Sequence, residues 1–389
     1  MKSPIASGNA SAASIEAQAP RDHVHERPVI KISDLTISFK TANGIVHAVR
    51  GVNMDLYRGQ TVAIVGESGS GKSVSAKQIM GIHSHNEIYE GGSIEFTYKD
   101  DDGREKTVDL TKIDDKEMAA LKGKHVAMVF QDPLTSLDPT MTIEGQLSES
   151  LTEHMGLSAE ALHARCVELL DLVGITDVEA RLKSYPHQLS GGMRQRVVIA
   201  IALSCDPDLL ICDEPTTALD VTIQARILQL IIDLQKKLGT SVIFITHNLG
   251  VVAKVADYVN VMYAGKVVEA GTLKDIFYDP RHPYTWGLLS SMPSLSTDRS
   301  ERLFTIPGNP PNMLNDIQGD AFAPRNPYAL EIDYKMEPPA FQVNEHHWAA
   351  TWLLDSRAPK VEMPEQLRNR IAGMKLESAK LREGDGNGD

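Results

Sequence analysis

Eight consecutive residues near position 70 have the composition of a loop that wraps a phosphate group. They are Gly66, Glu67, Ser68, Gly69, Ser70, Gly71, Lys72 and Ser73, which fit the pattern G-x-x-x-x-G-K-S. Glycines let the backbone approach phosphate oxygens closely, with successive N–H groups pointing inward. We expect Lys72 to supply a positive charge to the β- and γ-phosphates and the Ser73 hydroxyl to bind Mg²⁺.

The residues on both sides of this loop make a chance match less credible. The short apolar run 61–65 predicts a strand that leads directly into Gly66, and a helix is expected to begin near Ser73. The N-terminus of a helix presents free N–H groups and a partial positive charge, both of which attract phosphate. The segment therefore predicts a binding site for a nucleotide with Mg²⁺.

Two adjacent carboxylates follow another predicted strand. Asp213 and Glu214 come directly after the apolar run 209–212. Asp213 is placed to hold Mg²⁺ through water, and Glu214 is placed to polarise a water that attacks the γ-phosphate. Two solvated acids at the end of a strand are the alternative, which the presence of a phosphate loop disfavours.

Two further polar residues end predicted strands. Gln131 follows the run 126–130, and His247 follows the run 241–246. The amide of Gln131 could touch both Mg²⁺ and the attacking water, and the imidazole of His247 could hydrogen-bond the γ-phosphate or the water. Either residue alone could be an ordinary polar strand end, but their order among the other motifs favours a catalytic role.

The elements that must position these residues alternate between short apolar runs and amphipathic stretches, which predicts an α/β core. Residues 29–65 are expected to form strands, with a turn at Asn43 and Gly44. Residues 222–238 and 161–173 have the periodicity of amphipathic helices and stop at glycine. Buried strands are expected at 61–65, 126–130, 209–212, 241–246 and 258–263.

Composition excludes several classes of protein. The 389 residues carry a net charge of -13, which argues against a surface that binds nucleic acid. The longest apolar run, 197–203, is far shorter than the roughly 20 residues that span a bilayer. Cys166, Cys205 and Cys212 have no spacing typical of a disulfide framework or a zinc site, which fits a reducing cytoplasm.

A second glycine-containing motif precedes a long helical run. Residues 189–195 read Leu-Ser-Gly-Gly-Met-Arg-Gln. They resemble the ABC signature, usually written LSGGQ, with Met193 at its last position, a departure common in the peptide-importer branch. Ser190 and the amides of Gly191 and Gly192 would form another anion site at a helix N-terminus. Because the chain already has one phosphate cradle, the second suggests that two chains share each nucleotide, as they do in that family.

The remaining motifs follow the family's order over residues 29–275. The resemblance implies that Asp220 communicates across the dimer and that Phe39 stacks on adenine, although a core Phe is the alternative. It implies an α/β ABC-type nucleotide-binding domain with a P-loop parallel-sheet core, an antiparallel β subdomain and a helical insert. We expect a disordered leader at 1–28, the ATPase domain at 29–275 with its helical subdomain at about 132–205, an extension at 276–358, and a charged helix with a disordered tail at 359–389.

Proline becomes frequent after about residue 271, which predicts a loop-rich module. Residues 281–311, 322–328 and 352–354 resemble the C-terminal extension of oligopeptide and dipeptide importer ATPases. Many members of that family carry four cysteines here that bind an iron–sulfur cluster. Those positions correspond to Asp320, Asn326, Asp333 and Thr351. We therefore expect no cluster, and a packing or regulatory role for the extension, with inert padding as the alternative.

The resemblance implies an ATP-hydrolysing subunit of a peptide importer at the cytoplasmic face of the membrane, with no nucleic-acid partner. Implied partners are two permease subunits, a second ATPase chain and a solute-binding receptor, with residues 133–142 docking on the permease. Importers of nickel or other small solutes are an alternative with the same motor. A soluble ABC ATPase of translation or repair is disfavoured by the single phosphate loop, and a regulator without turnover is disfavoured by the presence of Glu214.

Overall fold

The computed structural model describes residues 26–217, 219–292, 305–314 and 316–385. Contacts between Cα atoms divide these residues into two units. The nucleotide unit comprises residues 26–268 together with 311–317, and the C-terminal unit comprises 269–310 and 318–385. Most of the expected leader and the last four residues of the expected tail lie outside the described ranges.

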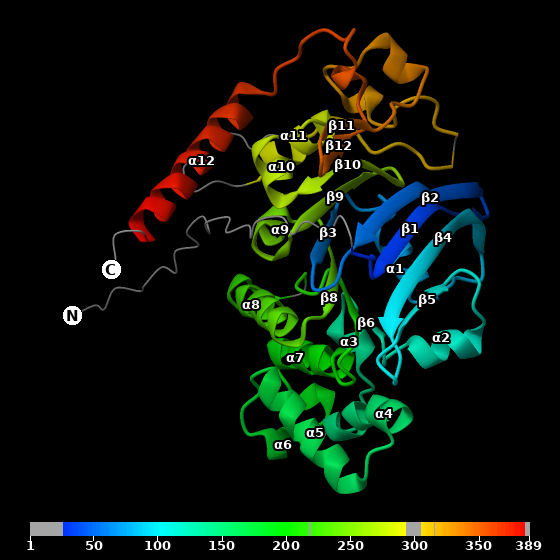
Figure 1. Ribbon diagram of the computed structural model, residues 1–389, viewed down its shortest axis with the longest axis vertical. Helices are drawn as coiled ribbons and strands as arrows, with labels where there is room; N and C mark the ends of the chain where they lie inside the picture. The colour runs from blue at the N-terminus through cyan, green and yellow to red at the C-terminus, as the bar shows by residue number, and fades with distance from the viewer. Residues whose placement is uncertain (1–25, 218, 293–304, 315, 386–389) are drawn as a thin grey trace. The chain divides into compact units, whose positions relative to one another are not determined.

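An antiparallel sheet of four strands forms one part of the nucleotide unit, in the order β2-β1-β4-β5 (Figure 1). Strand β1 is continuous, with a register shift between Ile32 and Leu35 where Asp34 adopts a positive φ of 49°. This shift is a β-bulge, which explains the break in the apolar pattern. The strands are β1 (Ile30–Thr41), β2 (Gly44–Leu56), β4 (Glu87–Lys99) and β5 (Glu105–Asp109).

A parallel sheet forms the core of the nucleotide unit, with its strands in the order β9-β3-β8-β7-β6. Almost every residue of these strands is buried, as expected for a parallel sheet covered on both faces. Its members are β3 (Thr61–Val65), β6 (Val126–Val129), β7 (Leu209–Asp213), β8 (Ser241–Thr246) and β9 (Tyr258–Tyr263). The carboxyl ends of parallel strands meet at one edge, and this is where the polar motifs begin.

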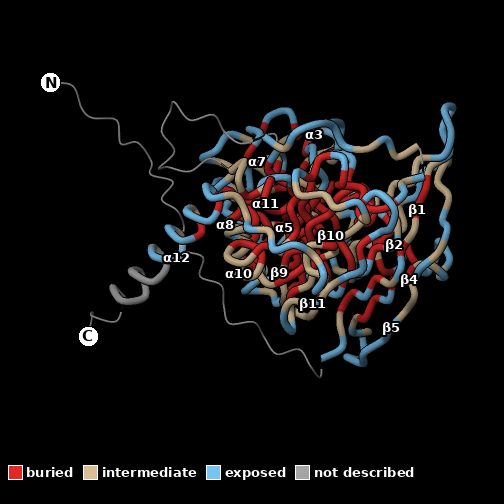
Figure 2. Tube along the Cα trace, turned by 90° about the horizontal axis from the view of Figure 1, so that it is seen from above, coloured by how far each residue is buried: buried red, intermediate tan, exposed pale blue. Residues whose placement is uncertain are grey.

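Four helices accompany the two sheets. They are α1 (Lys72–Ile79), α2 (Asp115–Leu121), α8 (Val221–Leu238) and α9 (Leu249–Val255). Helix α8 ends at Gly239, which adopts a left-handed conformation, as the sequence predicted. The outer strand β5 and much of β4 are exposed or half-buried, in contrast to the buried core (Figure 2).

The segment between β6 and β7 is helical, as predicted. It contains α3 (Pro133–Ser136), α4 (Ile143–Met155), α5 (Ala159–Leu172), α6 (Val178–Leu182) and α7 (Gly191–Ala202). The side chains of Thr142, Ser158 and Ser190 accept hydrogen bonds from backbone N–H groups in the first turns of α4, α5 and α7. Across the described ranges, no helix is long and apolar enough to cross a lipid bilayer.

The C-terminal unit contains short regular elements joined by turns. They are most of β10 (Lys266–Thr272), α10 (Leu273–Tyr278), α11 (Pro283–Ser290), β11 (Phe341–Asn344), β12 (His347–Ala349) and α12 (Glu365–Asp385). Strand β10 pairs with β12 through Glu269 opposite Ala349 and Ala270 opposite Trp348. The guanidinium of Arg370 on α12 donates to the carbonyls of Leu289 and Met292, which ties α12 to the end of α11.

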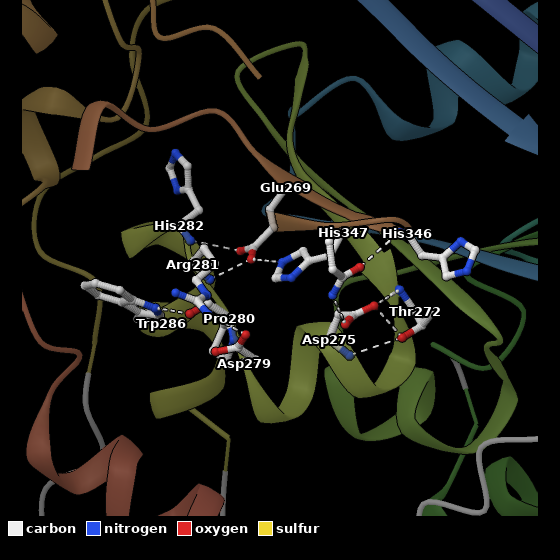
Figure 3. Close-up of polar contacts among 11 residues, drawn as sticks. Glu269, Thr272, Asp275, Asp279, Pro280, Arg281, His282, Trp286, His346 and His347 are labelled. Carbon is white, nitrogen blue, oxygen red and sulfur yellow. Dashed lines mark hydrogen bonds and ion pairs between the residues drawn. The ribbon is translucent and has the colours of Figure 1, made fainter. Parts of the chain in front are cut away.

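A buried carboxylate holds this unit together (Figure 3). The side chain of Glu269 is fully buried and accepts three hydrogen bonds: from the N–H of Arg281 (2.6 Å), from the N–H of His282 (3.1 Å) and from Nε2 of His347 (2.8 Å). Burial lowers the pKa of His282 to about 3, so its ring is neutral, and Nδ1 accepts from the N–H of Tyr284. One side chain thus joins β10, β12 and the start of α11.

We expect Glu269→Ala to lower the free energy of unfolding by about 3–5 kcal/mol, because it leaves three donors buried without an acceptor. Chemical unfolding of the purified subunit measures this effect. Glu331→Ala, in the same unit, is the matched control, because the Glu331 carboxylate is 95% exposed and forms a surface ion pair with Lys335. A Glu269→Ala variant that unfolds with the midpoint of the control would contradict the assignment.

Candidate active site

The phosphate loop packs directly against two backbone carbonyls. A Cβ atom added to Gly66 would lie 2.1 Å from the carbonyl oxygen of Met262 on β9. One added to Gly71 would lie 2.5 Å from the carbonyl oxygen of Ala48 on β2, and Gly71 has a φ of 98°. Only glycine fits at either position, which explains two fixed positions of the motif. The loop therefore packs between β9 of the parallel sheet and β2 of the antiparallel sheet.

Lys72 lies inside this loop. It is buried, and its Nζ donates to the carbonyl oxygens of Gly66 (2.8 Å) and Glu67 (2.9 Å). Burial lowers the pKa of Lys72, while the charges of Glu214 and Asp213 act in the opposite direction. The ammonium group therefore lies inside the loop that is predicted to bind phosphate, where it donates to backbone carbonyl oxygens.

Two of the three residues expected at Mg²⁺, Ser73 and Asp213, meet at the same edge. Oγ of Ser73 donates to Oδ1 of Asp213 at 2.9 Å. Burial raises the pKa of Asp213, the hydrogen bond from Ser73 opposes this, and the charge of Glu214 raises it further. A hydroxyl and a carboxylate are the hard oxygen donors that Mg²⁺ prefers, so these residues fit the ion.

Glu214 stands at the centre of a group of polar side chains. Its Oε1 lies 3.0 Å from Nδ1 of His247, and its Oε2 accepts from Nε2 of Gln131 at 3.5 Å. The residue adopts a positive φ of 47°, and its N–H donates to the carbonyl of Ile245 on β8. The structure therefore brings together the three residues that the sequence assigned to catalysis.

The ionisation of Glu214 follows from its partners. Burial acts to raise its pKa, but hydrogen bonds from His247 and Thr217 and the charges of His247 and Lys72 outweigh burial, so the net pKa is lowered. Glu214 is consequently a carboxylate over a wide pH range, the form that a general base requires. Thr217, whose Oγ1 donates to Oε2 of Glu214 at 2.9 Å, was missed by the sequence analysis. The signal in the sequence that could have indicated this contact was the position of Thr217, three residues after Glu214.

The signature residues are not part of this group. Oγ of Ser190 caps α7 by accepting from the N–H of Met193 (3.4 Å). Gly191 and Gly192 face the start of α8: a Cβ added to them would lie 3.9 Å from Leu219 and 2.8 Å from Ile223 respectively. The signature is therefore placed beside the loop that follows β7 of the same chain.

Asp220 and Phe39 occupy supporting positions. Oδ1 of Asp220 caps α8 by accepting from the N–H groups of Thr222 (3.1 Å) and Ile223 (3.0 Å). Phe39 is half-buried and packs, like Val74 of α1, against the core of the nucleotide unit. This packing fits the alternative that Phe39 is a core residue. The stacking on adenine that the resemblance implies stays a prediction. Gly69, Ser68 and Ser70 complete the phosphate loop between β3 and α1.

Comparison with known proteins places this arrangement in a family. The family model described as ABC transporter matches residues 49–217, and the model described as the C-terminal region of oligopeptide/dipeptide transporters matches residues 268–332. The oligopeptide transport ATP-binding protein OppD of Bacillus subtilis is 55% identical over 88% of this chain and 94% of its own length. This chain belongs to the ABC transporter family, in its oligopeptide/dipeptide branch. The dipeptide transport ATP-binding protein DppD of Lactococcus lactis is 53% identical over 86% of this chain and 94% of its own length.

Solved structures agree with the ABC ATPase fold. A dimeric structure of MJ0796, titled a bacterial ABC transporter cassette, matches with a TM-score of 0.54 at 28% identity, covering 63% of this chain and 98% of that one. A post-hydrolysis state of the same cassette bound to ADP and phosphate matches equally well, with a TM-score of 0.54 at 28% identity and the same coverage of 63% and 98%. The fold class expected from the sequence is thus confirmed, and the chain is an ABC ATPase.

We expect Gly71→Ala to weaken ATP binding about tenfold or more. The added methyl group imposes about 1–2 kcal/mol of left-handed strain and displaces the loop from Ala48, which turns its amides away from the phosphates. Isothermal titration with ATP and Mg²⁺ measures the affinity. Gly91→Ala is the control, because a Cβ there meets no atom within 4 Å. Unchanged affinity in Gly71→Ala would contradict the packing argument.

Proposed function

We propose that this chain is the ATP-binding and ATP-hydrolysing subunit of an importer for oligopeptides or dipeptides. One observation carries the proposal. The phosphate loop, the Ser73–Asp213 pair and the Glu214–His247 pair lie at one edge of the sheet. The chain that carries them is similar to OppD and DppD over nearly the whole length of those relatives. Those relatives are named for oligopeptide and dipeptide transport. The similarity extends into the C-terminal region, and no feature of the described residues favours nickel or another small solute.

The chemistry follows from the geometry. Lys72 and the amides of residues 66–73 bind the β- and γ-phosphates, and Lys72 exchanges its backbone carbonyl partners for phosphate oxygens. Ser73 and Asp213, with Gln131, would hold Mg²⁺, and the ion would supply positive charge to the phosphate oxygens. Glu214 accepts a proton from the attacking water, and His247 orients its carboxylate.

Two chains share each nucleotide in this proposal. Ser190, Gly191 and Gly192 form a helix N-terminus suited to an anion, yet in their own chain they pack beside the start of α8. In this proposal they bind the γ-phosphate that the phosphate loop of a second ATPase subunit holds. Asp220, at the start of α8, would communicate this contact across the dimer. The solved MJ0796 cassette, titled dimeric, supports such a pairing.

The motor requires partners that carry the cargo across the membrane. We propose two permease subunits, with residues 133–142 of this chain as the docking segment, and a solute-binding receptor on the other side. The second ATPase chain is proposed to be a paralogue. The subunit would lie at the cytoplasmic face of the membrane as a peripheral protein.

The C-terminal unit does not fit an iron–sulfur cluster. The four positions assigned to cluster cysteines hold oxygen-bearing side chains, and all four are buried. In each residue one side-chain oxygen accepts from a nearby backbone N–H: Asp320 from Phe322, Asn326 from Tyr328, Asp333 from Leu330 and Thr351 from Leu353. Local hydrogen bonds thus stabilise turns that thiolates would otherwise anchor to metal. We propose that this unit folds without a cluster.

Glu214→Gln tests the assignment of the general base. The variant should bind ATP, accumulate as an ATP-bound dimer and lose about 100-fold or more of its ATPase rate, because an amide cannot accept the proton. Lys72→Ala should instead weaken nucleotide binding. Native mass spectrometry and phosphate release, with permease present, measure both properties. Undiminished turnover of Glu214→Gln would refute the role of the carboxylate.

The absence of a cluster is tested by spectroscopy. Protein purified without oxygen after growth in iron-rich medium should show no absorbance band near 400 nm, because no thiolate ligand set is present in the C-terminal unit. Iron analysis should give far less than one atom per chain. Stoichiometric iron together with such a band would overturn the proposal.

A further inference from the structure

The carboxylate of Glu214 has a short hydrogen bond to a residue that the proposed mechanism does not use. Oγ1 of Thr217 donates to Oε2 at 2.9 Å, whereas the other donor to that oxygen, Nε2 of Gln131, lies at 3.5 Å. Hydrogen bonds to a carboxylate are strong at the shorter distance and weak at the longer one. Oε2 is therefore held mainly by Thr217, as Oε1 is held by His247.

Local backbone geometry sets this contact. Glu214 has a φ of 47°, and the N–H of Thr217 donates to the carbonyl of Glu214 at 3.3 Å. The chain turns back immediately after β7, so a side chain three residues later faces the carboxylate. The turn is the structural reason that a hydroxyl at position 217 reaches Glu214.

The same loop leads to the start of α8. The N–H of Leu219 donates to the carbonyl of Thr216 at 3.2 Å, and Nε2 of Gln224 donates to Oγ1 of Thr216 at 3.0 Å. Leu219 lies near Gly191 of the signature, and Asp220 caps α8. The hydroxyl of Thr216 is thus bonded to α8, whereas the hydroxyl of Thr217 is bonded to Glu214.

We propose that Thr217 is a positioning residue for ATP hydrolysis, which fixes the carboxylate of Glu214 through Oε2 so that the carboxylate faces the attacking water. The inference rests on the proposed function, because it takes Glu214 as the general base.

Removal of the hydroxyl leaves Oε2 with only the longer hydrogen bond from Gln131. The carboxylate can then rotate about its terminal bond, which places the base poorly and lowers the rate of proton transfer. Because the hydroxyl acts on the orientation of the base, its loss should change the rate of hydrolysis and leave nucleotide affinity unchanged.

The decisive experiment compares Thr217→Val with Thr217→Ser and Thr216→Val in the importer assembled with its permeases. Valine keeps the shape of threonine without its hydroxyl, serine keeps the hydroxyl, and Thr216→Val makes the same change one residue away, where the hydroxyl bonds Gln224. ATPase rates are measured against ATP concentration. We expect kcat of Thr217→Val to fall about tenfold or more with little change in KM.

The controls should separate positioning from general damage. Thr217→Ser should retain most of the rate, and Thr216→Val should behave like the unaltered protein. Thr217→Val combined with Glu214→Gln should be no slower than Glu214→Gln alone, because the hydroxyl acts through the carboxylate. A normal kcat in Thr217→Val, an equal defect in Thr217→Ser or Thr216→Val, or a further loss in the double variant would each overturn the inference.

These outcomes are distinct from failure of the proposed function. If Glu214→Gln retains full turnover, the assignment of the general base fails, and the inference fails with it. If Glu214→Gln is inactive while Thr217→Val is normal, only the role of Thr217 is refuted. Titration with ATP confirms that each variant still binds nucleotide, so a loss of rate is not a loss of binding.

Discussion

The close contact between the phosphate loop and two backbone carbonyls determines the rest of the site. Met262 of β9 and Ala48 of β2 approach so near to Gly66 and Gly71 that no side chain fits, and the loop is fixed between two sheets. Helix α1 begins directly after the loop, at Lys72. Because β3, β7 and β8 are adjacent and parallel, the residues that follow them reach the same edge as the loop.

The polar groups of the site satisfy one another in this structure. Lys72 bonds backbone carbonyls, Ser73 bonds Asp213, and Glu214 bonds His247 and Thr217. Buried polar groups without partners are costly, so these hydrogen bonds stabilise the site. In the proposed function, phosphate oxygens would replace the backbone carbonyls as partners of Lys72, and Ser73 and Asp213 would hold Mg²⁺.

Local motifs allowed much of this to be predicted from the sequence. The loop at 66–73, the buried strands and the grouping of Glu214 with His247 followed from short runs whose chemistry is independent of distant residues. Strands β4 and β5 were not assigned, because their exposed, polar residues lack a clear alternation. Glu269 and His347 are 78 positions apart, and no local pattern predicts that they meet in the core of the C-terminal unit. Thr217 was missed because its role depends on the positive φ of Glu214, a conformation that sequence alone seldom reveals.

The central claim is that each ATP is held from both sides, by the loop at 66–73 of one subunit and the helix tip at 190–192 of its mate. A structure of the assembled importer with ATP and Mg²⁺, trapped before hydrolysis, tests this most directly. The account predicts that Ser190 of this chain contacts the γ-phosphate bound to the other ATPase subunit, and that Lys72 contacts the nucleotide of its own site. A closed complex in which every contact to ATP comes from a single subunit would contradict the account.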